Sequence, residues 1–74
     1  MTHPPAPREF TPSQLGEAAR YLAELEPGTR VYVEEWDGAR WRFIFGDDCQ
    51  HAKNGLSRVR SGARFRLRLV RTVH

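Results

Sequence analysis

The segment of residues 64–69 alternates strictly between arginine and an apolar residue. Successive side chains of a β-strand point to opposite faces of the sheet, so Phe65, Leu67 and Leu69 would share one face and the arginines the other. Such a strand is stable only when other strands pair with it and another element covers its apolar face. The pattern predicts a sheet with one buried face, in which this strand runs over residues 63–73.

A helix over residues 10–26 is the best-marked element that would cover that face. Thr11 is a favourable N-cap, Pro12 suits the first helical position, and Gln14 completes a capping box. The apolar residues that follow recur at helical spacing and form one stripe. This stripe consists of Leu15, Ala18, Ala19, Leu22 and Leu25. A Pro-Gly pair then ends the helix.

Residues 30–45 are predicted to form a β-hairpin whose turn lies at residues 36–38. The length of the turn decides which side chains share a face. A two-residue turn would put Trp41 and Phe43 on the same face as Glu34, so we favour a three-residue loop with Gly38 in the left-handed conformation. This register gives one apolar face, made of Val31, Val33, Trp41, Phe43 and Phe45. It gives one polar face, made of Tyr32, Glu34, Arg40 and Arg42, with Glu34 opposite Arg40.

Residues 46–62 admit two interpretations. A helical stripe is formed by Cys49, Ala52, Leu56 and Val59, and Asp47 or Asp48 would cap it. Alternatively, the turn dipeptide Asn54–Gly55 would close a second hairpin between residues 49–53 and 56–60. We favour a short helical segment that ends near this dipeptide.

These elements predict an α+β fold in which an N-terminal helix packs on a small curved antiparallel sheet of three or more strands. With more strand in the middle segment, the architecture becomes a helix plus a five-stranded, barrel-like sheet. The 74 residues have room for one domain, which we place at residues 10–74 after a flexible, proline-rich tail at residues 1–9. Because neither a membrane-spanning run nor a signal peptide is evident, we expect a soluble cytoplasmic protein.

Charge is distributed unevenly along the chain. The net charge is +3, but residues 1–37 carry three basic and seven acidic side chains, whereas residues 38–74 carry nine basic and two acidic ones. Such asymmetry indicates either an electrostatic partner for one half or neutralisation of one half by the other within the fold.

The residue types that carry chemistry are few, and we expect no enzymatic activity, no cofactor and no metal. Asp47, Cys49 and His51 would share a face on a strand, but three ligands are too few for a closed zinc site. Cys49 as nucleophile with His51 as base is the only workable catalytic pairing. We interpret this segment instead as a capping aspartate, Asp47 or Asp48, followed by a buried thiol and a surface histidine.

The arginine stripe, defined as Arg64, Arg66 and Arg68, is the sharpest functional signal. Alternate residues of a strand lie about 6.6 to 6.8 Å apart, which roughly matches the spacing of successive phosphates along one nucleic-acid strand. Arg58 and Arg60, together with Arg40 and Arg42, would widen this basic surface, and Tyr32 and Trp36 would stack on unpaired bases. Cations on an exposed strand also serve simply to keep it solvated.

A protein partner is the interpretation that we favour. Trp36 near the hairpin turn is a suitable anchor because tryptophan and arginine dominate the energetics of interfaces, and Tyr32, Arg40 and Arg42 would flank it. We therefore expect a small non-enzymatic protein-interaction module, such as an inhibitor or antagonist of a larger macromolecular machine. The alternative is a small nucleic-acid-binding protein that uses the arginine stripe. Association of two copies through the edges of the sheet is compatible with both.

Overall fold

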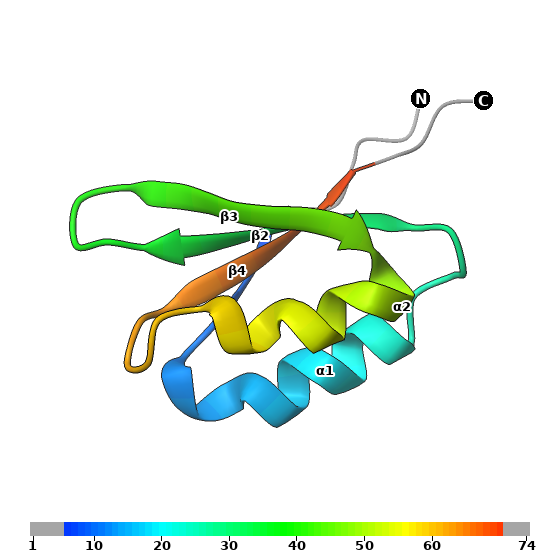
Figure 1. Ribbon diagram of the computed structural model, residues 1–74, viewed down its shortest axis with the longest axis horizontal. Coiled ribbons are helices and arrows are strands. Elements are labelled where there is room, and N and C mark those ends of the chain that lie inside the picture. The colour runs from blue at the N-terminus through cyan, green and yellow to red at the C-terminus, as the bar shows by residue number, and fades with distance from the viewer. Residues whose placement is uncertain (1–5, 71–74) are drawn as a thin grey trace.

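Two helical segments lie on one side of an antiparallel sheet in the computed structural model, which describes residues 6–70 (Figure 1). The strands are β1 (Arg8–Phe10), β2 (Arg30–Trp36), β3 (Trp41–Asp48) and β4 (Phe65–Val70), in the order β1-β4-β2-β3. The helices are α1 (Leu15–Ala23) and α2 (Cys49–Ala52), and the 3-10 segments are η1 (Pro12–Gln14) and η2 (Lys53–Arg58). The fold is therefore α+β, as predicted, with an open sheet.

The hydrophobic core lies between the helices and the face of the sheet that they cover, which we call the inner face. Ten buried residues form it: Phe10, Ala18, Leu22, Val31, Val33, Cys49, Ala52, Leu56, Phe65 and Leu67. Every strand except β3 contributes to this list, and so do α1, α2 and η2. The opposite, outer face of the sheet is not covered by a helix anywhere in residues 6–70 (Figure 1).

The segment before α1 differs from the prediction. Arg8 and Glu9, which we expected in the tail, belong to β1, and this strand pairs with β4 so that Phe10 lies opposite Phe65. The helix is therefore not the first element of the chain. Its expected first turn is the 3-10 segment η1, where Gln14 Oε1 accepts a hydrogen bond from the backbone N of Thr11 at 2.8 Å. That bond is one half of the predicted capping box.

The β2–β3 hairpin has a longer loop than predicted. Trp36 pairs with Trp41, so the loop consists of residues 37–40. Asp37 Oδ1 accepts hydrogen bonds from the backbone N–H groups two and three residues later, at 2.8 and 2.9 Å, and these bonds fix the loop. Gly38 has a φ of +102°, which is the left-handed conformation that we predicted for it. The prediction of a three-residue loop is wrong, because the loop has four residues.

The longer loop reverses the face assignment of the following strand. A four-residue loop has the same parity as a two-residue turn, so Trp41 and Phe43 lie on the outer face and not in the core. A bulge of one residue further along β3 returns Phe45 to the inner face. Glu34 consequently lies opposite Phe43 and not opposite Arg40.

The middle of the chain is helical, as favoured. α2 and η2 together cover residues 49–58, and the stripe that we predicted points into the core, with Val59 partly buried beside it. The predicted end near Asn54–Gly55 is wrong, because the segment continues through this dipeptide as η2 to Arg58. Gly55 packs directly against the ring of Phe45, where a Cβ atom would overlap the ring. Since this segment adds no strand, the five-stranded, barrel-like alternative is not confirmed.

The alternation in β4 is confirmed. Phe65 and Leu67 are buried and Leu69 is partly buried, whereas Arg66 pairs with residues of the outer face. The strand begins at Phe65, two residues later than predicted, and it is described as far as Val70, so residues 71–73 of the predicted strand lie outside the described residues. Residues 1–5 of the predicted tail also lie outside them. None of the helices within residues 6–70 has the length and apolar character needed to span a membrane.

Candidate functional site

Four aromatic side chains share the outer face of the sheet. Tyr32 and Trp36 project from β2, and Trp41 and Phe43 project from β3. Trp36 packs edge-on against Trp41 with ring centroids 5.3 Å apart, and Tyr32 packs edge-on against Phe43 at the same distance. Phe43 is 57% exposed, which is unusual for a large apolar side chain. The outer face therefore presents two aromatic pairs with Glu34 between them along β2.

The arginine stripe lies on these rings. Arg64 lies 5.9 Å from the ring centroid of Trp36, and Arg68 lies 5.2 Å from that of Tyr32. Arg66 makes the closest contact, with its guanidinium carbon 4.5 Å from the centroid of the Trp41 ring. A cation at such distances is attracted to the negative face of an aromatic ring. The two sets of side chains thus form one layer over three strands.

Two carboxylates neutralise most of the charge of this layer. Glu34, whose side chain is only 10% exposed, accepts a 2.7 Å hydrogen bond from Arg66 Nε, and it accepts a longer one of 3.5 Å from Arg68. Glu9 pairs with Arg64 at 2.7 Å, and both of those side chains are half exposed. Charge-assisted bonds of this kind fix the orientation of a guanidinium group. The guanidinium groups of the stripe are therefore already engaged within the protein.

The residues predicted to bind a protein partner do not form one surface. Tyr32 and Trp36 share the outer face, whereas Arg42 lies opposite Glu35 on the inner face and Arg40 belongs to the hairpin loop. Sequence reasoning missed Trp41 and Phe43 as surface residues because it placed them in the core. Only the even number of residues in the hairpin loop would have shown that they lie on the outer face.

Arg58 and Arg60 do not extend the arginine stripe. Arg58 lies 5.4 Å from the centroid of the Phe45 ring, which is on the inner side of β3. The backbone N of Arg60 donates a 2.6 Å hydrogen bond to Oε1 of Glu35, whose residue is only 4% exposed. Both arginines thus lie on the side of the sheet opposite to the stripe. Within residues 6–70 neither of them forms an ion pair, and the same holds for Arg40 and Arg42.

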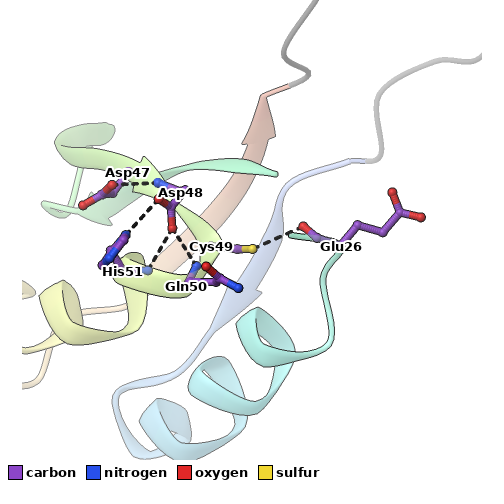
Figure 2. Close-up of polar contacts among 6 residues, drawn as sticks. All are labelled: Glu26, Asp47, Asp48, Cys49, Gln50 and His51. Atoms are coloured by element: carbon purple, nitrogen blue, oxygen red, sulfur yellow. Dashed lines mark hydrogen bonds and ion pairs between the residues drawn. The ribbon is translucent and has the colours of Figure 1, made fainter. Parts of the chain in front are cut away.

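A second polar cluster lies where β3 runs into α2 (Figure 2). Ligand atoms of Asp47, Asp48 and His51 all lie within 4.8 Å of one another. Asp48 is the helix cap: its Oδ1 accepts hydrogen bonds from the backbone N of Gln50 at 2.9 Å and of His51 at 3.0 Å. Its Oδ2 lies 2.8 Å from Nδ1 of His51. The prediction that Asp47 or Asp48 caps this helix is confirmed for Asp48.

His51 and the neighbouring aspartates stabilise each other's charged forms. The hydrogen bond from His51 lowers the pKa of Asp48, and the same bond, together with the charges of the two aspartates, raises the pKa of His51. Cys49 takes no part, because its buried Sγ points to the backbone O of Glu26 at 3.4 Å (Figure 2). The structure therefore does not bring Cys49 and His51 together as a nucleophile and its base.

Comparisons with protein-family models, with curated proteins and with solved structures give no match to this chain.

Proposed function

We propose that this protein is a small non-enzymatic protein-interaction module that binds its partner through the outer face of the sheet. The observation that carries the proposal is the layer of aromatic rings and arginines on that uncovered face. Tryptophan, tyrosine and arginine are the residues that contribute most to the binding energy of protein interfaces. The guanidinium groups of the stripe arginines are held by Glu9 and Glu34, so these side chains lose little conformational entropy on binding.

The same ion pairs argue against nucleic acid as the ligand of this face. A phosphate group would have to displace Glu34 from Arg66 and Glu9 from Arg64. A base would have to displace a guanidinium group from the ring of Trp36, Trp41 or Tyr32 before it could stack. A protein partner would cover the layer with its charges already paired, which avoids leaving a buried charge uncompensated.

Nucleic-acid binding stays the second candidate because of a different set of arginines. Arg40, Arg42, Arg58 and Arg60 carry four positive charges that have no ion pair in the described part of the chain. Binding through them would weaken steeply between about 50 mM and 200 mM salt. An anisotropy titration with short DNA and RNA would then lose binding in Arg58→Ala/Arg60→Ala but keep it in Arg64→Ala/Arg66→Ala/Arg68→Ala.

The proposal is tested by affinity capture from cells with matched variants. Tyr32→Ala/Trp36→Ala removes one ring from each aromatic pair of the outer face, and both residues lie on β2, away from the β3 edge. Arg20→Ala/Glu24→Ala removes two exposed side chains at the end of α1, on the far side of the sheet. A protein retained by the wild type and by the α1 variant, but lost from the outer-face variant, supports the proposal. Equal retention by all three chains contradicts it.

A further inference from the structure

The two edges of the sheet are very different. β1 forms one edge and has three residues, whereas β3 forms the other and has eight. β3 pairs only with β2 among the residues that the structure describes. A long edge strand presents a row of backbone N–H and C=O groups that another strand can pair with.

We propose that two copies of this chain associate by antiparallel pairing of their β3 strands, with the twofold axis between Ile44 and Phe45. In this register Arg42 of each copy lies opposite Asp47 of the other. Phe43 of each copy likewise lies opposite Gly46 of the other. The two sheets then join into one sheet of eight strands.

The bulge in β3 makes this register consistent with the faces of the strand. Opposed residues of an antiparallel pair must share a face. Residues five positions apart lie on opposite faces of a regular strand, but Arg42 and Asp47 both lie on the inner face because the bulge falls between them. Phe43 and Gly46 both lie on the outer face for the same reason. A bulge discourages pairing with an arbitrary strand, whereas here it permits β3 to pair with itself.

The charges at the two ends of the paired segment are complementary. Arg42 is exposed and Asp47 is partly exposed, and neither forms an ion pair within residues 6–70. Twofold pairing brings them together twice in each dimer. Opposite charges placed directly across a pair of strands are stabilising, and like charges there are destabilising.

The side chains on the outer face also fit in size. Phe43 is 57% exposed in the single chain. Gly46 has no side chain, and the Tyr32 ring leans over it so closely that a Cβ atom would lie 2.6 Å from Cδ1 of Tyr32. Phe43 of the second copy would therefore lie beside that ring and lose much of its exposure. The aromatic row of the outer face would continue from one copy into the other.

The test is a charge exchange followed by sedimentation velocity. The wild type is expected to form a species of twice the 8.6 kDa chain mass. Each of Arg42→Asp and Asp47→Arg is expected to weaken this dimer by roughly tenfold or more, because repulsive pairs replace attractive ones at both ends. An equimolar mixture of these two variants restores both attractive pairs, so it should form a heterodimer. Arg20→Asp makes the same change in charge on α1 and should leave the dimer intact.

Each outcome decides the question, provided that circular dichroism shows the variants to be folded. A heterodimer from two variants that are separately monomeric supports this register, and it also shows that both variants fold. A wild type that stays monomeric up to roughly 1 mM overturns the proposal. A dimer whose dissociation constant is unchanged by both charge reversals overturns it as well. Trp36→Ala leaves this edge unchanged, so loss of partner binding in that variant is a separate result.

Discussion

Arg66 donates a hydrogen bond of 2.7 Å from Nε to Oε1 of Glu34, and its guanidinium carbon lies 4.5 Å from the ring centroid of Trp41. One side chain on β4 is thus held by a carboxylate on β2 and by a ring on β3. Arg68 reaches the same carboxylate only at 3.5 Å, and its buried Nε has no hydrogen-bond partner among residues 6–70. Arg66 therefore forms a much closer hydrogen bond to Glu34 than Arg68 does.

This difference predicts unequal costs of truncation. Arg66→Ala removes a short charge-assisted bond to the nearly buried Glu34, so we expect the free energy of unfolding to fall by about 1–3 kcal/mol. Arg68→Ala removes a longer bond from a more exposed side chain, and we expect a loss of less than about 1 kcal/mol. Urea denaturation of both variants measures the two values. Equal losses would mean that Glu34 does not discriminate between the two arginines.

Glu35 is expected to matter through the backbone and not through charge. Its carboxylate accepts a hydrogen bond from the backbone N of Arg60 and holds the chain that leads from η2 into β4. Glu35→Ala leaves that N–H without its partner, at a cost of about 1–3 kcal/mol. Glu35→Gln keeps a carbonyl acceptor and should cost clearly less. Denaturation of both variants is the measurement, and equal costs would contradict this role.

Two glycines predict opposite effects of the same substitution. A Cβ atom at Gly55 would overlap the ring of Phe45, so Gly55→Ala should lower the free energy of unfolding by about 1–3 kcal/mol. Gly16 lies in α1, and nothing in the described part of the chain lies within 4 Å of such an atom. Gly16→Ala should therefore raise that free energy by about 0.5–1 kcal/mol. Thermal unfolding of the two variants gives the sign of each change in the free energy of unfolding. A Gly55→Ala protein as stable as the wild type would contradict the packing described for η2.

The pair of Asp48 and His51 predicts how stability depends on pH. The pKa of His51 is raised above its ordinary value of 6.5, so its contribution is complete below pH 6.5 and is lost as the pH rises through the raised pKa. The pKa of Asp48 is lowered from 3.8, so its contribution is complete above that value and is lost as the pH falls through the lowered pKa. The pair therefore stabilises the fold fully between these two values.

An NMR titration of the His51 ring checks this pair. Asp48→Asn should shift the pKa of His51 down towards 6.5, because the asparagine cannot supply the negative charge. Asparagine is also a good helix cap, so α2 should stay intact in this variant. An unchanged pKa for His51 would show that the contact with Asp48 is absent in solution.

The sequence predicts those elements whose residue pattern repeats within one short segment. The alternation of β4 and the helical stripe from Cys49 to Leu56 each lie in one short segment, and both are confirmed. β1 could not be predicted in this way because three residues have no detectable period. It forms through pairing with β4, more than fifty residues away.

The candidate site was mispredicted for a related reason. The faces of β3 depend on the number of residues in the hairpin loop, and this number is set by hydrogen bonds to the carboxylate of Asp37. One additional loop residue transfers Trp41 and Phe43 from the predicted core to the outer face. Their partners, Arg66 and Tyr32, lie on other strands, so no local pattern indicates that these rings are accommodated at the surface.

Site-specific photo-crosslinking in cells tests whether the outer face of the sheet is the protein-binding surface. The photoreactive residue replaces either Glu9 on β1 or Tyr32 on β2, which lie on that face away from the β3 edge, and control chains carry it at Arg20 or Glu24 of the α1 end. We predict that both outer-face positions crosslink to the same partner protein, that excess wild-type chain competes with the reaction, and that Trp36→Ala chain competes poorly. Crosslinking of the partner from α1 but not from the outer face would show that the partner binds elsewhere.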